Sequence, residues 1–141
     1  MTTIEEHKKR LAEHLEEIDD AISQGMEKKP VTIGFHCSVC AIELLELYLH
    51  TSNKIPIGKI LKHDWFKKPV LEQKKEPLAD RKLPVNFERK EEIYNLIYEI
   101  EEKRNSLVYG SPTKEKIKEV LENFQKLKEI LKQLLKNEIQ L

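Results

Sequence analysis

The sequence predicts an all-α protein, an up-and-down four-helix bundle with an additional short helix in the connection between the second and third long helices. Apolar residues recur every three or four positions in four long stretches, and capping or helix-breaking residues bound each stretch. No stretch alternates apolar and polar residues as a half-buried strand would. Because 141 residues is the size of one domain, we expect a single helical domain over residues 1–141.

The first helix is predicted from about residue 3 to Gly25. Thr2 and Thr3 each precede a glutamate by three residues, Glu5 and Glu6, which is the capping-box pattern of a helix start. Acidic residues lie between the apolar positions, so we expect one face of this helix to contact solvent. The apolar stripe consists of Ile4, Leu11, Leu15, Ile18 and Ile22.

The second helix is predicted from Pro30, a residue suited to a first helical turn, to about residues 51–53. Its only charged residues are Glu43 and Glu46. A helix this apolar is either the centre of the bundle or half of a subunit interface. Its broad apolar face consists of Ile33, Cys37, Cys40, Ala41, Leu44, Leu45, Tyr48 and Leu49.

The periodic pattern breaks after residue 53. Pro56 precedes a short candidate helix, Gly58 to Phe66, and residues 67–86 then show no sustained periodicity. We expect a long basic loop there, which makes the segment a functional candidate, because structureless loops of this length are uncommon in compact domains. Prolines punctuate this loop at positions 69, 77 and 84.

The third helix is predicted to begin after Asn86 as N-cap and to end at Gly110 as a left-handed C-cap. Ser111 and Pro112 follow at once and suit the cap and first turn of a fourth helix, which continues to about Ile139. So short a junction predicts that the two helices pack as antiparallel neighbours.

Arg104 interrupts the apolar stripe of the third helix. The stripe steps by four, three, four and three residues through Ile93, Ile97, Ile100, Arg104 and Leu107, so the guanidinium is predicted to point inward. Such a cation needs acceptors across a groove, on another subunit or on a ligand. Alternatively, it reaches water near the helix end and interacts with the helix dipole.

Charge is balanced overall, with 25 basic and 25 acidic residues, but it is unevenly distributed. Residues 54–90 carry a net charge of +6 and residues 1–53 a net charge of −5. The basic segment offers a place for a phosphate-bearing partner, or is simply a solvated surface. No run approaches the ~20 apolar residues of a membrane span, and the N-terminus lacks the order of a signal peptide, so we expect a cytoplasmic protein without membrane association and with reduced cysteines.

The pair Cys37 and Cys40 forms the only Cys-x-x-Cys pattern. His36 and His50 are the nearest further ligands, but fourteen positions separate them, which is about 21 Å along a helix. They cannot share one metal ion on a straight helix, so we expect close helix packing at the cysteines and neither metal nor cofactor. Neither a nucleophilic triad signature nor a glycine-rich phosphate loop occurs.

The run Arg104-Asn105-Ser-Leu-Val-Tyr109-Gly110 resembles the signature of the HEPN domains (higher eukaryotes and prokaryotes nucleotide-binding), in which an Arg and a polar residue precede a His near the end of the third long helix. These are helical bundles, usually homodimeric, and many act beside a nucleotidyltransferase in toxin-antitoxin pairs. In ribonuclease members the His helps to activate the ribose 2′-hydroxyl and the Arg stabilises the phosphate, without a metal.

In this chain Tyr109 occupies the histidine position. A phenol is a poor base at neutral pH, but it can donate a hydrogen bond to phosphate or stack on a base. The resemblance therefore implies that Arg104, Asn105 and Tyr109 contact a nucleotide or RNA phosphate. His63, beside basic and aromatic residues, is the one other histidine that we consider as a catalytic substitute.

Three hypotheses follow. The first is a homodimeric binding module for a nucleotide or RNA, centred on Arg104, with a nucleotidyltransferase as possible partner. The second is a metal-independent endoribonuclease of toxin type, in which Tyr109 or His63 fills the missing role. The third is a non-catalytic helical interaction protein whose Arg104 pairs across the dimer with Glu43 or an acidic residue of the first helix.

Overall fold

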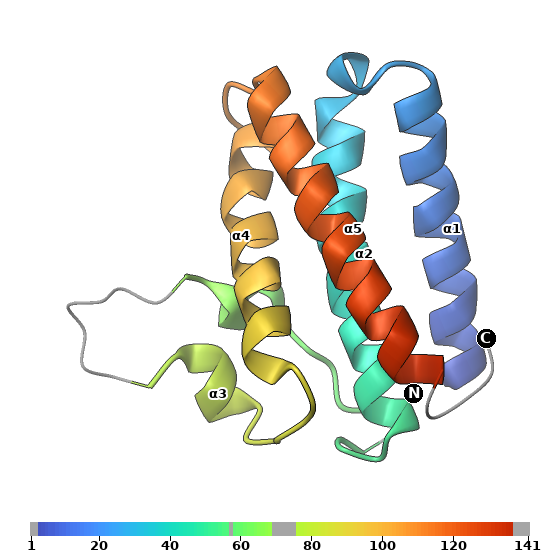
Figure 1. Cartoon of the computed structure of the whole chain (residues 1–141), viewed down its shortest axis with the longest axis vertical. Helices are drawn as coiled ribbons and strands as arrows, with labels where there is room; N and C mark the ends of the chain where they lie inside the picture. Colours follow the sequence, from blue (N-terminus) through green and yellow to red (C-terminus); the bar gives the residue numbers. More distant parts are fainter. Residues whose placement is uncertain (1–2, 57, 69–75, 137–141) are drawn as a thin grey trace.

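The protein is an all-α bundle, as predicted. A computed structural model describes residues 3–56, 58–68 and 76–136, and contains no strand among them. The long helices are α1 (Ile4–Ser23), α2 (Pro30–Thr51), α4 (Lys90–Val108) and α5 (Lys114–Lys136), and the short ones are η1 (Met26–Lys28), η2 (His63–Phe66) and α3 (Leu78–Lys82). Figure 1 shows four long helices that run alternately up and down, with α3 beside the lower half of the bundle and the connection between α1 and α2 at the top.

Helix α1 begins with the capping box that the sequence predicts. Thr3 Oγ1 accepts the N–H of Glu6 at 3.1 Å, and the Glu6 carboxylate accepts the N–H of Thr3 at 2.8 Å. This exchange satisfies two backbone donors that a helix start leaves without partners. The helix ends at Ser23, and Gly25 supplies the positive φ of 106° that turns the chain toward α2.

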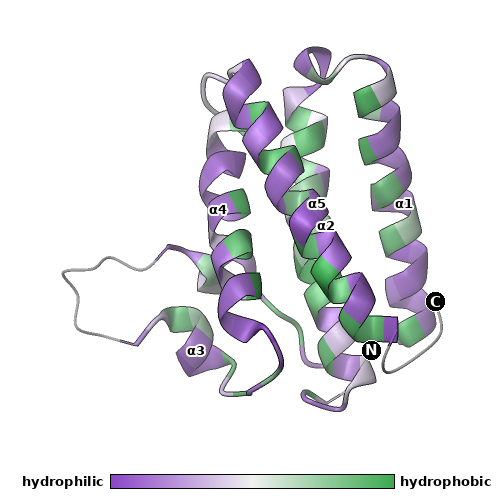
Figure 2. Ribbon diagram, viewed as in Figure 1, coloured by the Kyte–Doolittle hydropathy of each residue, from purple (hydrophilic) through white to green (hydrophobic). Residues whose placement is uncertain are grey.

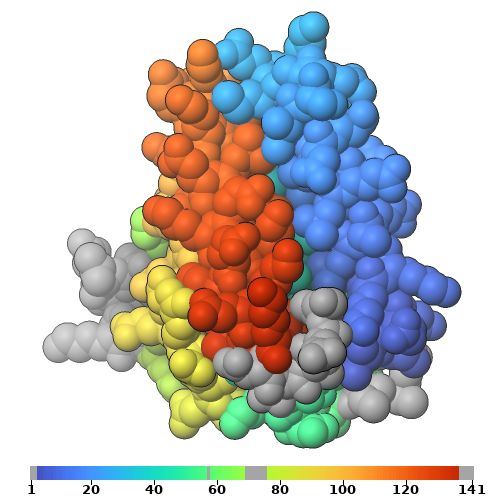
Figure 3. Space-filling model, turned by 45° about the vertical axis from the view of Figure 1, so that its right-hand side comes forward, coloured from blue at the N-terminus to red at the C-terminus, as the bar shows by residue number. Residues whose placement is uncertain are grey.

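Helix α2 lies at the centre of the bundle, which is one of the two positions that the sequence predicts for so apolar a helix. Fifteen of its 22 residues are buried, and it packs against α1, α4 and α5. In Figure 2 the hydrophobic positions of the outer helices face inward, and Figure 3 shows α1 and α5 covering most of α2. The expectation that no run approaches a membrane span is wrong for α2, which is long and apolar enough by length and composition alone. However, 72% of its apolar window is buried inside the bundle, as is usual for a core helix.

The connection between α2 and α4 differs from the prediction in two places. Only the last turn of the short helix expected at Gly58 to Phe66 forms, as η2, because the N–H of Leu61 donates to the Glu46 carboxylate at 2.6 Å instead of to a helical carbonyl. The loop expected at 67–86 contains the helix α3, which begins after Pro77 and buries Ala79. Five residues are too few to show a period in the sequence. Residues 69–75 lie outside the described part.

The predicted helix caps near α4 and α5 are wrong in detail. Helix α4 begins at Lys90 rather than after Asn86, because Arg89 adopts a left-handed conformation with φ 61° and its guanidinium pairs with Glu92. Helix α5 begins at Lys114, and Thr113, not Ser111, caps it by accepting the N–H of Lys116 at 3.2 Å. The predicted end at Ile139 lies outside the described residues.

Gly110 is not a left-handed C-cap. The φ angle of Gly110 is not positive, as a left-handed cap would require. A Cβ at this position would lie 3.1 Å from the Cα of Ser106, so glycine favours the close approach of the chain to the last turn of α4. The turn leads directly into the antiparallel packing of α4 and α5 that the short junction predicts.

Candidate functional site

Arg104 lies at the edge of the core, less deeply buried than the inward position in the stripe predicts. Ile97, Ile100 and Leu107 of the same face are fully buried, whereas Arg104 is half-buried. Its Nε atom is buried and has no hydrogen-bond partner, and no ion pair joins its guanidinium to any residue in the described part of the chain. The side chain is thus a partly desolvated cation without an acceptor.

A pocket of about 460 Å³ opens beside Arg104, between α4 and η2. It brings together three of the four residues that the sequence singles out, Arg104, Asn105 and His63. Tyr109 does not line it, because the phenol follows the last residue of α4 and is 78% exposed. The full lining consists of His63, Asp64, Phe66, Lys67, Lys68, Glu101, Glu102, Arg104 and Asn105.

His63 is held by two residues that the sequence did not single out. Its Nδ1 lies 2.7 Å from Glu101 Oε1 and 3.2 Å from Ser38 Oγ, and the Ser38 hydroxyl donates to the same carboxylate oxygen. Because a carboxylate only accepts, we assign the His63 proton to Nδ1, and the neutral ring then keeps a lone pair on Nε2. An imidazole oriented in this way is suited to accept a proton from a substrate hydroxyl.

The charges around the pocket are partly cancelled. Lys68 lies 2.7 Å from Glu99 and 3.4 Å from Glu102, and its hydrogen bond to Glu99 raises the pKa of the Lys68 ammonium. Glu101 is engaged by His63. Among the lining residues, Arg104 and Lys67 remain as cations without an ion-pair partner in the described chain, against the carboxylates of Asp64 and of Glu101, whose partner His63 is assigned as neutral. The charges of the lining nearly balance, so the case for an anionic ligand rests on the unpaired guanidinium of Arg104.

The two cysteines belong to the core. Cys37 and Cys40 are fully buried, and burial raises the pKa of Cys40 to about 12 and that of Cys37 further. Thiols so far from ionisation are poor nucleophiles and poor metal ligands. The close helix packing that their spacing predicts is what the structure contains.

Glu43 is already occupied within the chain. Its carboxylate accepts from Arg10 and contacts His7, both on α1. The sequence-based alternative, in which Glu43 pairs with Arg104, therefore has to compete with two partners that are in place. This makes Glu43 a poor partner for Arg104.

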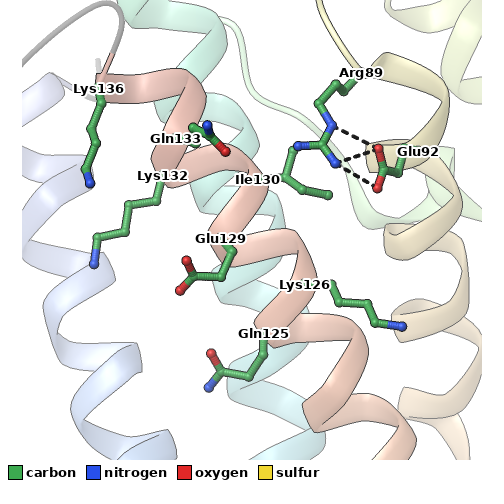
Figure 4. A pocket seen from close by; sticks show the side chains of 9 residues that line it. All are labelled: Arg89, Glu92, Gln125, Lys126, Glu129, Ile130, Lys132, Gln133 and Lys136. Atoms are coloured by element: carbon green, nitrogen blue, oxygen red, sulfur yellow. Dashed lines mark hydrogen bonds and ion pairs between the residues drawn. The ribbon is translucent and has the colours of Figure 1, made fainter.

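A wider groove of about 780 Å³ runs along α5. Figure 4 shows its lining side chains spread apart, with Lys126 pointing toward α4 and Lys132 and Lys136 toward the other side. Arg89 is bonded to Glu92 at 2.9 and 3.0 Å. Since its side chains do not converge on one point, the groove is a weaker candidate than the Arg104 pocket.

Comparisons with family models, with curated proteins and with solved structures find no match to this chain. The geometry of the pocket is therefore the basis for the functional argument.

Proposed function

We propose that this protein binds a phosphate group of a nucleotide or RNA in the pocket beside Arg104. The observation that carries the proposal is the half-buried, unpaired guanidinium of Arg104, which lines one pocket together with Asn105 and His63. A phosphate offers pairs of oxygen acceptors that the planar guanidinium can bind in bidentate fashion. The Asn105 amide and the Lys67 ammonium supply further donors.

The resemblance of Arg104 and Asn105 to the HEPN signature supports the same proposal. It extends the proposal to a homodimer, with a nucleotidyltransferase as possible partner. Light scattering on the purified protein tests the dimer directly. Tyr109 does not line the pocket within one chain. Its exposed phenol is therefore proposed to contact a ligand or a second subunit outside this pocket.

Metal-independent RNA cleavage is a second candidate function, favoured by the contact of His63 with Glu101. In this reaction His63 Nε2 takes the proton of the ribose 2′-hydroxyl, and the 2′-oxygen attacks the adjacent phosphorus. The bond to the 5′-oxygen breaks, that oxygen takes a proton from solvent, and a 2′,3′-cyclic phosphate remains. Arg104 stabilises the negative charge that develops on the phosphate oxygens.

The decisive experiment measures binding of a fluorescent single-stranded RNA oligonucleotide, and of ATP, by anisotropy and calorimetry in EDTA. Loss of a charge-assisted bidentate contact is expected to make Arg104→Ala bind about 10- to 100-fold more weakly, and Arg104→Lys to recover part of the loss. Arg81→Ala, which removes an exposed charge on α3, is the matched control and should bind nearly as the wild type does. Equal affinity of the Arg104→Ala protein and the wild type refutes the proposal.

A further inference from the structure

A cluster of polar side chains is buried between α1 and α2, at a distance in sequence from the residues of the Arg104 pocket. His7 projects from α1 toward Glu43, Glu46 and His50 of α2, and all four side chains are at least nine-tenths shielded from solvent. One donor atom each from His7, Glu43 and Glu46 lies within 4.8 Å of the others. Buried ionisable groups at this density need an explanation, because desolvation penalises each charge.

The hydrogen bonds inside this group leave two imidazole nitrogens without partners. His7 Nδ1 contacts a Glu43 oxygen and His50 Nε2 lies 3.2 Å from the carbonyl oxygen of Lys59, so we assign the protons to those nitrogens. His7 Nε2 and His50 Nδ1 are buried and bond to nothing in the described chain. The two rings pack with centroids 5.1 Å apart. The protein alone therefore does not satisfy the hydrogen-bonding groups of these two rings, although they are only 1% and 6% exposed.

We infer that His7, Glu43 and Glu46 form a binding site for a divalent transition-metal cation, with the His50 ring packed beside it. Two carboxylates and one imidazole are ligands that zinc and its neighbours in the transition series accept, whereas magnesium and calcium prefer oxygen alone. Ligands on facing helices of a bundle are the usual way to build such a site.

The charge balance supports a cation. Arg10 lies 3.0 Å from Glu43 and compensates one carboxylate, which leaves Glu46 as a second buried negative charge. On binding, the cation takes the lone pair of His7 Nδ1, and the neutral ring carries its single proton on Nε2 instead. Tetrahedral zinc ligands lie about 3.3 Å apart, so the donor atoms have to approach one another when the ion binds.

The site also touches the connection that carries His63. Glu46 accepts the N–H of Leu61 at 2.6 Å, and His50 contacts the carbonyl of Lys59. A cation held by Glu46 thereby fixes the segment that leads into η2. The metal site stands independently of the phosphate pocket, whose binding test is run in EDTA.

The test is a titration of the EDTA-stripped full chain with Co²⁺, followed by visible absorption, and with Zn²⁺, followed by equilibrium dialysis. We expect one ion per chain, the intense bands of low-coordinate cobalt, and a Tm higher by roughly 5–10 °C at a metal concentration of about 100 Kd. Glu46→Gln keeps an oxygen acceptor for Leu61 but removes the charge, and it should weaken cobalt binding by about tenfold or more. His7→Gln should do the same.

The matched control is His14→Gln. It removes another histidine of the same helix interface that bonds to His36, and it should bind cobalt as the wild type does. Far-UV circular dichroism of the metal-free variants checks that each is folded. The inference is overturned if the wild type shows only weak octahedral cobalt bands, retains no stoichiometric zinc, or loses binding in His14→Gln but not in Glu46→Gln.

Discussion

His63 Nδ1 lies 2.7 Å from Glu101 Oε1, which joins a histidine of the basic connection to a carboxylate of α4 one turn before Arg104. The contact crosses 38 positions of sequence. The contact orients the imidazole of His63, and Arg104 supplies a cation in the same pocket. These are the two groups that metal-independent phosphodiester cleavage needs. Whether the protein cleaves RNA therefore depends on these side chains.

Replacing His63 separates cleavage from binding. In an RNA cleavage assay in EDTA, His63→Gln is expected to lower the rate by about 10²–10⁴, the usual contribution of a general base, while the anisotropy Kd stays near the wild-type value. Glu101→Gln keeps an oxygen acceptor for the Nδ1 proton and should lower the rate less. Wild-type cleavage by the His63→Gln protein would remove the histidine from the mechanism and leave only the binding function.

The two lysines of the pocket should differ in their contribution to RNA binding. Each free cation that contacts a phosphate adds about 0.7 to the slope of log affinity against log salt for single-stranded RNA. Lys67→Ala should therefore reduce the slope by about that amount. Lys68 is already paired with Glu99 and Glu102, so Lys68→Ala should change the slope less. A larger effect at Lys68 would contradict the proposed distribution of charge.

The parts of the site that the sequence predicts are those set by the period of a single helix. The stripe through Ile97, Ile100 and Leu107 directs Arg104 inward without knowledge of any other element, and these three neighbours are buried as expected. The capping box at Thr3 is equally local. Such features follow from the spacing of side chains on one helix.

The parts that the sequence does not predict depend on contacts between elements. Ser38 and Glu101 reach His63 only because α2, α4 and η2 pack together. His7 is one of two histidines a heptad apart in the sequence, and its partners on α2 lie 36 and more positions away. Only the antiparallel packing of α1 on α2 shows that Glu43 and Glu46, two charges on an apolar helix, are paired inward.

Stability should fall in mildly acidic solution because of His14. Its Nδ1 lies 2.9 Å from His36 Nδ1. Burial is the largest cause that lowers the pKa of His14 from its ordinary value, and the neighbouring His36 is the second. Arg10 lowers this pKa further, whereas Glu43 and Glu13 raise it. The unfolded chain then binds the proton more readily, so the free energy of unfolding decreases as pH falls below 6.5. Denaturation at pH 8 and pH 5.5 measures this, and His14→Gln should show a smaller decrease than the wild type. An equal decrease in both would assign the effect to other histidines.

Gly34 sets the distance between α2 and the last turn of α4. A Cβ at this position would lie 2.9 Å from the Cβ of Leu107, an atom too close to its backbone to move aside, and 3.3 Å from Val108 Cγ2. Gly34→Ala gains up to about 1 kcal/mol of helix propensity, but overpacking costs about 1–3 kcal/mol, so we expect a net loss of about 1–2 kcal/mol. Urea denaturation measures it. The double variant Gly34→Ala with Leu107→Ala would not relieve the clash, since Leu107 keeps its Cβ, and its loss should at least equal that of Gly34→Ala. A more stable Gly34→Ala protein would show that α2 and α4 move apart freely where they cross.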